Sequence, residues 1–340
     1  MSSQLVMYQT RREFLHGLTL ASTAGVFGCG PRAVTAEPAL ETTTIRLVKI
    51  PTICQAPQYV AEELLKAEGF TDVQYVKKKG TGEIPQALAS GEADINGHFA
   101  APLITEIEAG APIVVLAGLH IGCFELFGTD RVHTIRDLKG KTVSVLELGS
   151  VEYIFLASMM AYVGVDPGKD IQWVTNPPAE SMRLLAEGKV DAFLGLPPGP
   201  QTLRAKQIGH VVVNSALDPP WSQYFCCMLA GNREFVRKHP NATKRALRAI
   251  LKANTICSLE PERTAHFLVD GDFTPSYDYA LQAMKDIPYS QWRAYSAEDT
   301  LRFYALRLHE AGLIKWSPKK IIAEGTDWRF LNALKQELKE

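Results

Sequence analysis

Residues able to bind a small molecule recur directly after the predicted strands of this 340-residue chain. They are hydroxyl, carboxyl, thiol, imidazole and aromatic side chains, together with glycines that leave backbone N–H groups accessible. The candidates are Cys54, Gln55, Thr81, Gly82, His98, Phe99, His120, Cys123, Glu125, Gly149, Ser150, Val151, Glu180, Pro197, Trp221 and Tyr224. Because ligands of open parallel sheets bind beyond the carboxyl ends of the strands, these residues predict one ligand site.

Each candidate suits a particular contact and has a structural alternative. Gly149 and Ser150 open a helix whose N–H groups could hold a carboxylate, sulfonate or nitrate oxygen, or Ser150 could simply cap that helix. Glu125 and Glu180 could accept hydrogen bonds from an amine or an aminopyrimidine, or form salt bridges. The histidines could donate, accept or titrate, and the aromatic candidates could stack on a flat ligand or pack in the core. The candidate loops contain no arginine, the usual bidentate anion clamp, which favours a polar organic molecule over a simple oxyanion.

The same residues offer little for catalysis. The sequence shows no Ser-His-Asp order, no phosphate-binding loop and no Cys/His zinc spacing. His120, Cys123 and Glu125 are close in sequence, but a strand would turn His120 and Cys123 to opposite faces. We therefore expect no catalytic residue, no metal and no cofactor, with a metal- or cofactor-dependent enzyme as the alternative.

The elements that must position these residues occur twice. Glu83, Leu88, Ala89, Gly91 and Asp94 correspond in order and spacing to Glu180, Leu185, Ala186, Gly188 and Asp191. Residues 44–47 correspond to 142–145, and 72–76 to 170–174, at nearly the same offset of about 98 positions. An offset this long is not a solenoid period. It predicts two α/β lobes that are built alike, with a cleft between them.

Each lobe reads as strand, helix, strand, helix, strand, and a mostly parallel sheet covered by helices is expected. Strands are predicted at 45–50, 73–76, around Ile95, 113–116, 142–146, 171–174, 190–194 and 224–230. After the last of these the pattern is mostly helical. We therefore predict lobe 1 from residues 43–125 and 226–340, with the C-terminal helices, and lobe 2 from residues 126–225. A two-stranded hinge would join them.

Residues 1–36 read as an export signal rather than as part of the fold. Arg11 and Arg12 precede Phe14 and a weakly apolar segment that ends near Gly28. This segment is too short and too polar to remain as a membrane helix. Paired arginines before such a segment are typical of a twin-arginine signal, although a disordered start could carry them by chance.

The signal could end at either of two places. Residues 34–36 look like a small-residue cleavage site, whereas residues 26–29 resemble a lipobox that would end the signal at residue 28 and acylate Cys29. Both predict a periplasmic protein that touches the membrane only through a lipid anchor, if at all. Without Cys29 an odd number of cysteines remains, so they cannot all pair within one chain, and buried free thiols are the default.

Composition excludes some classes of partner. A net charge of −1, with 46% hydrophobic and 21% charged residues, is typical of a globular protein. It indicates no affinity for nucleic acid or for an anionic membrane surface.

Three motifs carry a family resemblance: Leu138-Lys139-Gly140-Lys141 before a strand, the Gly149-Ser150 helix start, and Leu-Leu-x-x-Gly-x-x-Asp-Ala at 184–192. Together they resemble the nitrate/sulfonate/taurine-type solute-binding proteins of ABC importers, a family that includes relatives of the thiamine-pyrimidine precursor binders. The resemblance covers about residues 43–290. The cysteine-rich iron motif of the yeast-type pyrimidine synthases is absent; only Cys123 is faintly similar to it.

The resemblance implies a type II periplasmic binding fold: two α/β lobes, a hinge crossed twice and closure on a small molecule. It implies a monomer without enzyme activity, whose partners are the permease and the ATPase of an ABC transporter. The expected ligand is a sulfonate, a nitrate-type anion, an amine or a pyrimidine. An enzyme on the same fold and a ligand sensor for a membrane partner are the alternatives.

Overall fold

The computed structural model describes residues 37–338. The predicted signal peptide and Cys29 lie outside the described residues. The fold is that of the compact unit beginning at Ala39. Among the described helices, none combines the length and the apolar run that a membrane span requires.

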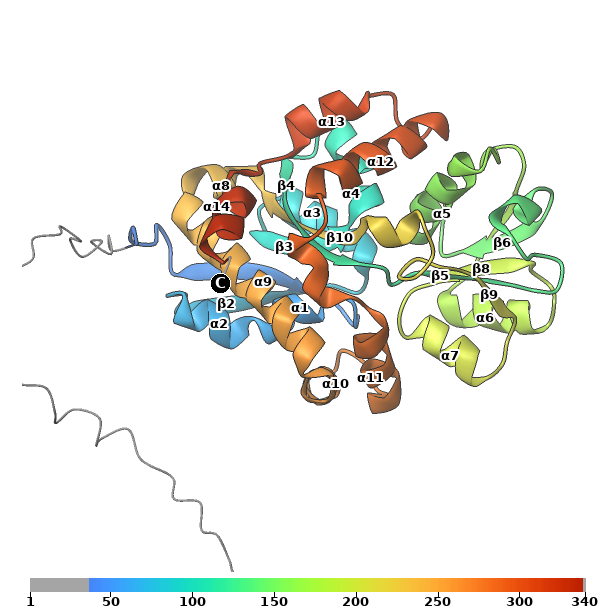
Figure 1. Cartoon of the computed structure of the whole chain (residues 1–340), viewed down its shortest axis with the longest axis horizontal. Coiled ribbons are helices and arrows are strands. Elements are labelled where there is room, and N and C mark those ends of the chain that lie inside the picture. Colours follow the sequence, from blue (N-terminus) through green and yellow to red (C-terminus); the bar gives the residue numbers. More distant parts are fainter. Residues whose placement is uncertain (1–36, 339–340) are drawn as a thin grey trace, which may run out of the picture. The chain divides into compact units, whose positions relative to one another are not determined.

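Three sheets form two lobes within this unit (Figure 1). Lobe 1 contains the parallel pair β1 (Thr44–Lys49) and β2 (Asp72–Lys77), and a sheet of β3 (Ile95–Phe99), β10 (Phe225–Asn232) and β4 (Ile113–Ile121). Lobe 2 contains a sheet in the order β7 (Gln172–Thr175), β6 (Thr142–Val145), β8 (Ala192–Gly195), β5 (Glu125–Gly128) and β9 (His210–Asn214). The two-lobed α/β architecture therefore agrees with the prediction.

Helices connect and cover these strands. The first lobe contributes α1 (Ala56–Val60), α2 (Glu62–Ala67), α3 (Ile84–Ala89) and α4 (Ala100–Glu108), and the second α5 (Val151–Tyr162), α6 (Pro178–Ala186) and α7 (Gly199–Ala205). The chain then continues through α8 (Arg233–Lys238), α9 (Pro240–Leu259), α10 (Pro261–Asp270), α11 (Tyr277–Asp286), α12 (Ala297–Glu310), α13 (Pro318–Gly325) and α14 (Arg329–Glu337). Short 3-10 turns lie at Thr81–Glu83, Ile135–Leu138, Trp221–Gln223 and Tyr289–Arg293.

The duplicated pattern is confirmed by matched hydrogen bonds in the two lobes. The Asp94 carboxylate accepts from the Arg46 backbone N–H at 2.8 Å, and the Asp191 carboxylate accepts from the Thr142 N–H at 2.9 Å. The backbone N–H groups of the same two aspartates donate back to the Arg46 and Thr142 carbonyls, each at 2.8 Å. The two aspartates that correspond in sequence thus hold the corresponding strands β1 and β6 in the same way.

The expectation of mostly parallel sheets is wrong. β10 runs antiparallel to β3 and β4, and β5 runs antiparallel to β8 and β9. The chain crosses from lobe 1 to lobe 2 between β4 and β5, and returns between β9 and β10. A strand that enters a lobe from its partner runs away from the cleft, whereas β3 and β8 run toward it, so β10 and β5 must be antiparallel to their neighbours.

Side-chain amides join the two sheets of lobe 1. The Val48 N–H donates to Asn96 Oδ1 at 2.8 Å, and Gln58 Nε2 donates to the Val48 carbonyl at 2.8 Å. The Gly97 N–H in turn donates to Gln58 Oε1 at 2.9 Å. Because these buried backbone groups are satisfied by side chains, β1 and β3 stay adjacent without a regular ladder.

The C-terminal helices pack mainly on lobe 1. α9 packs against α1 and α2, and α12 packs against α4. α12 also touches α5 of lobe 2. The exact residue boundaries of the two lobes remain a prediction.

The two crossing segments, residues 122–124 and 215–224, are hydrogen-bonded to each other. The Ser215 hydroxyl accepts from the N–H groups of Cys123 at 3.2 Å and Phe124 at 3.0 Å, and donates to the Phe124 carbonyl at 2.8 Å. The Ser215 N–H donates to the same carbonyl at 2.9 Å. These bonds fix the relative position of the two segments that must bend if the lobes move.

Candidate functional site

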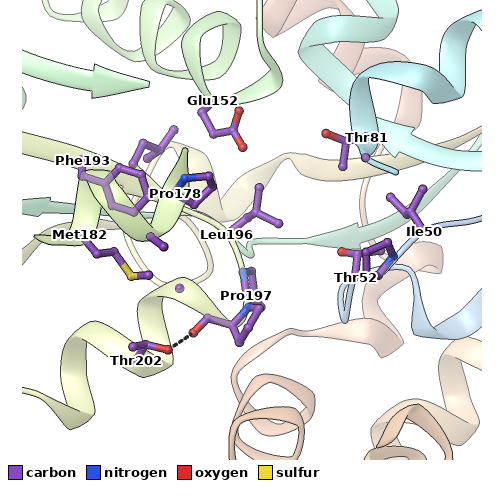
Figure 2. A pocket seen from close by; sticks show the side chains of 16 residues that line it. Ile50, Thr52, Thr81, Glu152, Pro178, Met182, Phe193, Leu196, Pro197 and Thr202 are labelled. Atoms are coloured by element: carbon purple, nitrogen blue, oxygen red, sulfur yellow. Dashed lines mark hydrogen bonds between the residues drawn. The ribbon is translucent and has the colours of Figure 1, made fainter. Parts of the chain in front are cut away.

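A cavity of about 390 Å³ lies where the strand ends of the two lobes face each other (Figure 2). Lobe 1 lines it with the residues that follow β1 and β2, and lobe 2 with those around β8 and at the starts of α5, α6 and α7. The lining residues are Ile50, Pro51, Thr52, Gly80, Thr81, Glu152, Pro178, Ala179, Met182, Phe193, Leu194, Leu196, Pro197, Pro198, Gly199 and Thr202. A cavity of this size suits a small organic molecule.

Helix starts bring the lobe 2 residues to the cavity. Ser150 caps α5, accepting from the Tyr153 N–H at 3.3 Å, and this fixes Glu152 in the first turn of that helix. α6 and α7 both carry proline in their first turn, where its missing N–H costs no helix bond. Proline therefore favours the start of α6 and of α7 beside the cavity.

The lining is largely apolar. Hydroxyl groups come from Thr52, Thr81 and Thr202, and the one charged group is the Glu152 carboxyl. No arginine, lysine or histidine of the described chain lines this cavity. A ligand would therefore meet a mostly apolar enclosure with one acidic anchor.

Glu152 is a buried carboxyl without a complete set of partners. Its exposed fraction is 7%, and Oε2 has no hydrogen-bond partner among the described residues. Figure 2 shows the carboxyl group pointing toward the space between Leu196 and Thr81. Burial raises the pKa of Glu152. A carboxylate held in this way is suited to a donor that arrives with a ligand.

Replacing Glu152 should change the pH dependence of stability. The pKa of Glu152 is higher in the folded protein than in the unfolded chain. As pH rises past the ordinary glutamate range, the unfolded chain therefore loses this proton first. The free energy of unfolding falls as a result, so Glu152 destabilises the folded protein at neutral pH. We expect Glu152→Gln to remove that loss and to make the ligand-free protein more stable at neutral pH. Urea unfolding between pH 4 and pH 8 measures the free energy of unfolding of both proteins as a function of pH.

The exposed Glu324, on α13, supplies the control. Glu324→Gln should leave the profile unchanged. Identical profiles for Glu152→Gln and the unmodified protein would contradict the raised pKa of Glu152.

Thr81 and Pro197 are the sequence-predicted site residues that line the cavity. Gly82 is exposed beside Thr81, and Gly149 precedes the cap of α5 with φ +90°. Val151, which was predicted as a site residue, is buried and does not line the cavity, whereas the next residue, Glu152, does.

Several candidates instead have structural partners. Gln55 is buried and donates to the Gly97 carbonyl at 2.8 Å. Glu180 accepts from Arg183 on the next turn of α6 at 2.6 Å. Ser150 serves as the helix cap described above. Their role as ligand contacts remains a prediction.

The aromatic candidates pack against other rings. Phe99 lies 4.9 Å from Phe124 between ring centroids, and Tyr224 stacks on Phe303 at 4.0 Å. Trp221 is buried and contacts Phe303 edge-on at 5.7 Å. These contacts join β3 and α12 to the crossing segments, and none of the three aromatic candidates lines the cavity.

The histidine and cysteine candidates are all buried. Burial lowers the pKa of His98 to about 4, so its imidazole is neutral at physiological pH. Cys54, His120 and Cys227 offer donor atoms within 4.8 Å of one another, and Cys123, Cys226 and Cys227 form a second such group. The described cysteines are all free and buried, as predicted. Sequence spacing could not reveal these groups, because their members come from separate segments.

Glu125 belongs to an ion-pair network that bridges the lobes. Arg204 of α7 bonds the Glu125 carboxylate, and donates to Asp286 Oδ2 of α11 at 2.5 Å. Burial raises the pKa of Glu125, and Arg204 opposes that shift. Because α11 packs with α9 and α10 on the lobe 1 side, the Arg204–Asp286 pair ties lobe 2 to lobe 1 beside the cavity.

Removing this tie should weaken the closed arrangement modestly. Asp286 is 35% exposed in its side chain, so we expect Asp286→Asn to cost about 0.5–1 kcal/mol, which is roughly a two- to fivefold loss of ligand affinity. Calorimetric titration of a bound ligand measures it. Asp278→Asn, an exposed position on the same helix, is the control and should have no effect. An unchanged affinity in both variants would contradict the bridging role.

Thr52 and Leu196 lie in the loops that were predicted after the strands, but Glu152 and Thr202 were not predicted as lining residues. From the sequence, Glu152 looks like an ordinary acidic residue in the first turn of a helix. A signal existed in the sequence, because that helix start was already placed beside the cleft.

Comparison with known proteins identifies the family of this chain. The NMT1-like family matches residues 38–268, more than half of the chain. The nitrate/nitrite binding protein NrtA of Nostoc is 24% identical over 295 residues, which cover 73% of this chain and 66% of NrtA. The bicarbonate-binding protein CmpA of Synechococcus elongatus is 25% identical over 310 residues, which cover 74% of this chain and 66% of CmpA. The chain thus spans slightly less than two thirds of the length of these relatives.

Among solved structures, the periplasmic nitrate-binding protein NrtA of Synechocystis superposes with a TM-score of 0.72 at 18% sequence identity. The match covers 89% of this chain and 90% of that one. The chain therefore has the periplasmic binding protein fold that the sequence predicted.

Proposed function

Because the chain belongs to the NMT1-like family, we propose that it is an extracytoplasmic solute-binding protein of an ABC importer. It binds a small organic molecule between its lobes and closes on it. The observation that carries this proposal is the cavity enclosed by the strand ends of two similarly built lobes. A ligand that contacts both lobes stabilises the closed state by its differential affinity for that state.

The lining favours a ligand with an amine or aminopyrimidine donor over nitrate, bicarbonate or a sulfonate. An anion in this cavity would lose its hydration without meeting a cationic side chain, and would face the Glu152 carboxyl. A protonated amine or an aminopyrimidine would supply the hydrogen-bond donor that Glu152 Oε2 lacks. The apolar walls formed by Met182, Phe193 and Leu196 suit the carbon skeleton of such a ligand.

The remaining roles follow from this function. The protein acts as a monomer in the periplasm and delivers its ligand to the permease and ATPase of an ABC transporter. Residues 1–36 would direct export of the protein by the twin-arginine route. If the signal ends at residue 28, Cys29 would be acylated. Residues 43–125 with 226–340, and residues 126–225, are the proposed moving bodies.

Isothermal calorimetry against amines, aminopyrimidines, taurine, alkanesulfonates, nitrate and bicarbonate tests the proposal. We expect heat from one of the amine-bearing compounds. With that ligand, Glu152→Gln should bind at least about tenfold more weakly, because a hydrogen bond to a charged group contributes roughly 1.5–3 kcal/mol.

Glu324→Gln is again the control and should bind like the unmodified protein, because Glu324 does not line the cavity. Tight binding of nitrate or bicarbonate, or full affinity in Glu152→Gln, would overturn the ligand class. A failure of every compound to bind would contradict the solute-binding role.

A further inference from the structure

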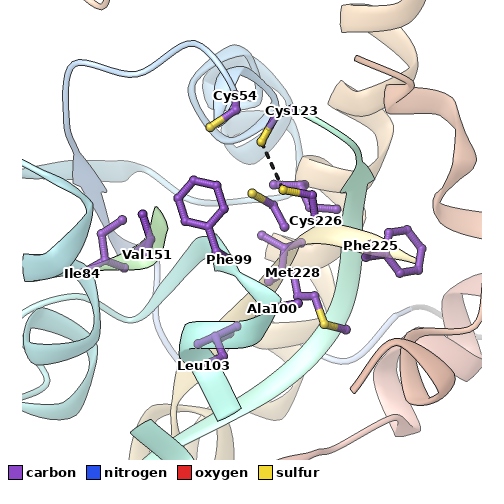
Figure 3. Packing of buried hydrophobic residues seen from close by; sticks show 14 of the residues in the cluster. Cys54, Ile84, Phe99, Ala100, Leu103, Cys123, Val151, Phe225, Cys226 and Met228 are labelled. Carbon is purple, nitrogen blue, oxygen red and sulfur yellow. Dashed lines mark hydrogen bonds between the residues drawn. The ribbon is translucent and has the colours of Figure 1, made fainter. Parts of the chain in front are cut away.

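A cluster of soft donor atoms lies in the core beside the crossing segments, and the proposed ligand cavity does not use it. Cys54 follows β1, His120 lies near the end of β4, Cys123 lies in the first crossing segment, and Cys226 and Cys227 begin β10. All five side chains are buried. Figure 3 shows the sulfur atoms of Cys123 and Cys226 facing each other, with Cys54 beside Cys123.

The cluster consists of two overlapping groups of three donors. Cys54, His120 and Cys227 form one, Cys123, Cys226 and Cys227 the other, and within each the donor atoms lie within 4.8 Å of one another. The sheet creates this proximity, because Cys227 pairs with His120 across β10 and β4. Cys227 is the member that both groups share.

His120 is oriented as a ligand would be. Its Nδ1 lies 3.0 Å from the Gly122 carbonyl, which can only accept, so Nδ1 carries the proton. The other ring nitrogen, Nε2, is buried and has no hydrogen-bond partner among the described residues, so it is the atom available to a metal ion. A backbone carbonyl that holds one ring nitrogen while the other is left free is the arrangement of metal-binding histidines.

The thiols have few competing partners. Cys123 Sγ lies 3.1 Å from Cys226 Sγ, and Cys54 Sγ lies 3.3 Å from the Thr52 hydroxyl. A disulfide between Cys123 and Cys226 would account for those two sulfurs only. It would leave Cys54, Cys227 and the unpartnered Nε2 of His120 without explanation.

We propose that this cluster binds a thiophilic metal ion, with Cu(I) preferred over Zn(II). Thiolate donors select Cu(I) and Zn(II), and imidazole suits both metals. Structural zinc sites require four ligands in a tetrahedral arrangement, whereas each group here offers three. Each coordinated thiol releases its proton to solvent as the ion binds.

The site adjoins both the cavity and the crossing segments. Thr52 lines the cavity and contacts Cys54. Cys123 lies in the first crossing segment, and Cys226 lies in β10, two residues after the second crossing segment ends. A bound ion would therefore link the ends of these segments and stabilise the lobe 1 side of the cleft.

The test uses the chain from residue 37 onward together with the full chain, both fully reduced under anaerobic conditions. Because the donors are buried, Cu(I) is supplied both to the folded protein and during refolding, with bathocuproine disulfonate as the competing chelator; Zn(II) is supplied in parallel. We expect at least one Cu(I) per chain to be retained, sulfur ligation in the X-ray absorption spectrum, and a higher melting temperature.

Two cysteine variants make the result specific. Cys227→Ser removes the shared donor and should lower Cu(I) affinity at least about tenfold, which corresponds to the loss of one ligand contact. Cys257→Ser is the matched control, since Cys257 is equally buried but lies outside both groups. Circular dichroism checks that both variants fold.

Absence of retained Cu(I) under both loading conditions would overturn the proposal, even if Cys227→Ser fails to fold. Retention of Zn(II) without Cu(I) would overturn the choice of ion. Equal losses in Cys227→Ser and Cys257→Ser, or a Cys123–Cys226 disulfide without metal in protein isolated from the periplasm, would overturn the site.

Discussion

The Ala179→Trp variant is expected to lose ligand binding by about 100-fold or more. Ala179 lies in the first turn of α6 and lines the cavity of about 390 Å³. An indole placed there occupies space that the ligand needs, and displacing it would cost a few kcal/mol in strain. Calorimetric titration with the ligand identified from the panel measures the loss.

Ala186→Trp, at the other end of α6, is the control. Ala186 is exposed and does not line this cavity. The same indole at that position should leave affinity within about twofold, because it adds no contact near the ligand. Equal affinity in both variants would mean that the ligand binds elsewhere.

The Gly122→Ala variant is expected to lose about 2–4 kcal/mol of folding free energy. Gly122 has φ +63°, and a Cβ there would lie 2.3 Å from Ala216 Cβ and 2.4 Å from Ala216 Cα. Ala216 lies on the other crossing segment, so relief of the clash requires the two segments to separate. Urea unfolding at fixed pH measures the loss.

Gly140→Ala separates backbone strain from the clash. Gly140 has a similar φ of +75°, but nothing lies within 4 Å of the position a Cβ would take. Its cost should be about 1 kcal/mol, from the left-handed conformation alone. If the two substitutions cost the same, the close approach of the crossing segments has no energetic importance.

The repeated architecture could be predicted because it is encoded locally. Asp94 and Asp191 recur at equivalent positions, and they hold the corresponding strands β1 and β6 through the same backbone hydrogen bonds. Strand directions could not be predicted as well. The alternation of strands and helices does not reveal that β5 and β10 enter from the opposite lobe.

The loops that form the cavity were predicted, but the side of each loop that faces it was not. After β1, Thr52 lines the cavity while Gln55 turns inward to satisfy the Gly97 carbonyl. Which side chain turns inward depends on a partner about forty residues away along the chain, in β3. The Cys/His cluster could not be predicted either, because its members are brought together only by the folding of segments that are far apart in the sequence.

The most direct test of the central claim is a crystal structure with the ligand that the calorimetric panel identifies. The account predicts ligand density in the cavity, in contact with Thr52 or Thr81 of lobe 1 and with Glu152 of lobe 2. Density that contacts residues of only one lobe, or that lies outside this cavity, would contradict closure of the two similar lobes on a ligand that both contact.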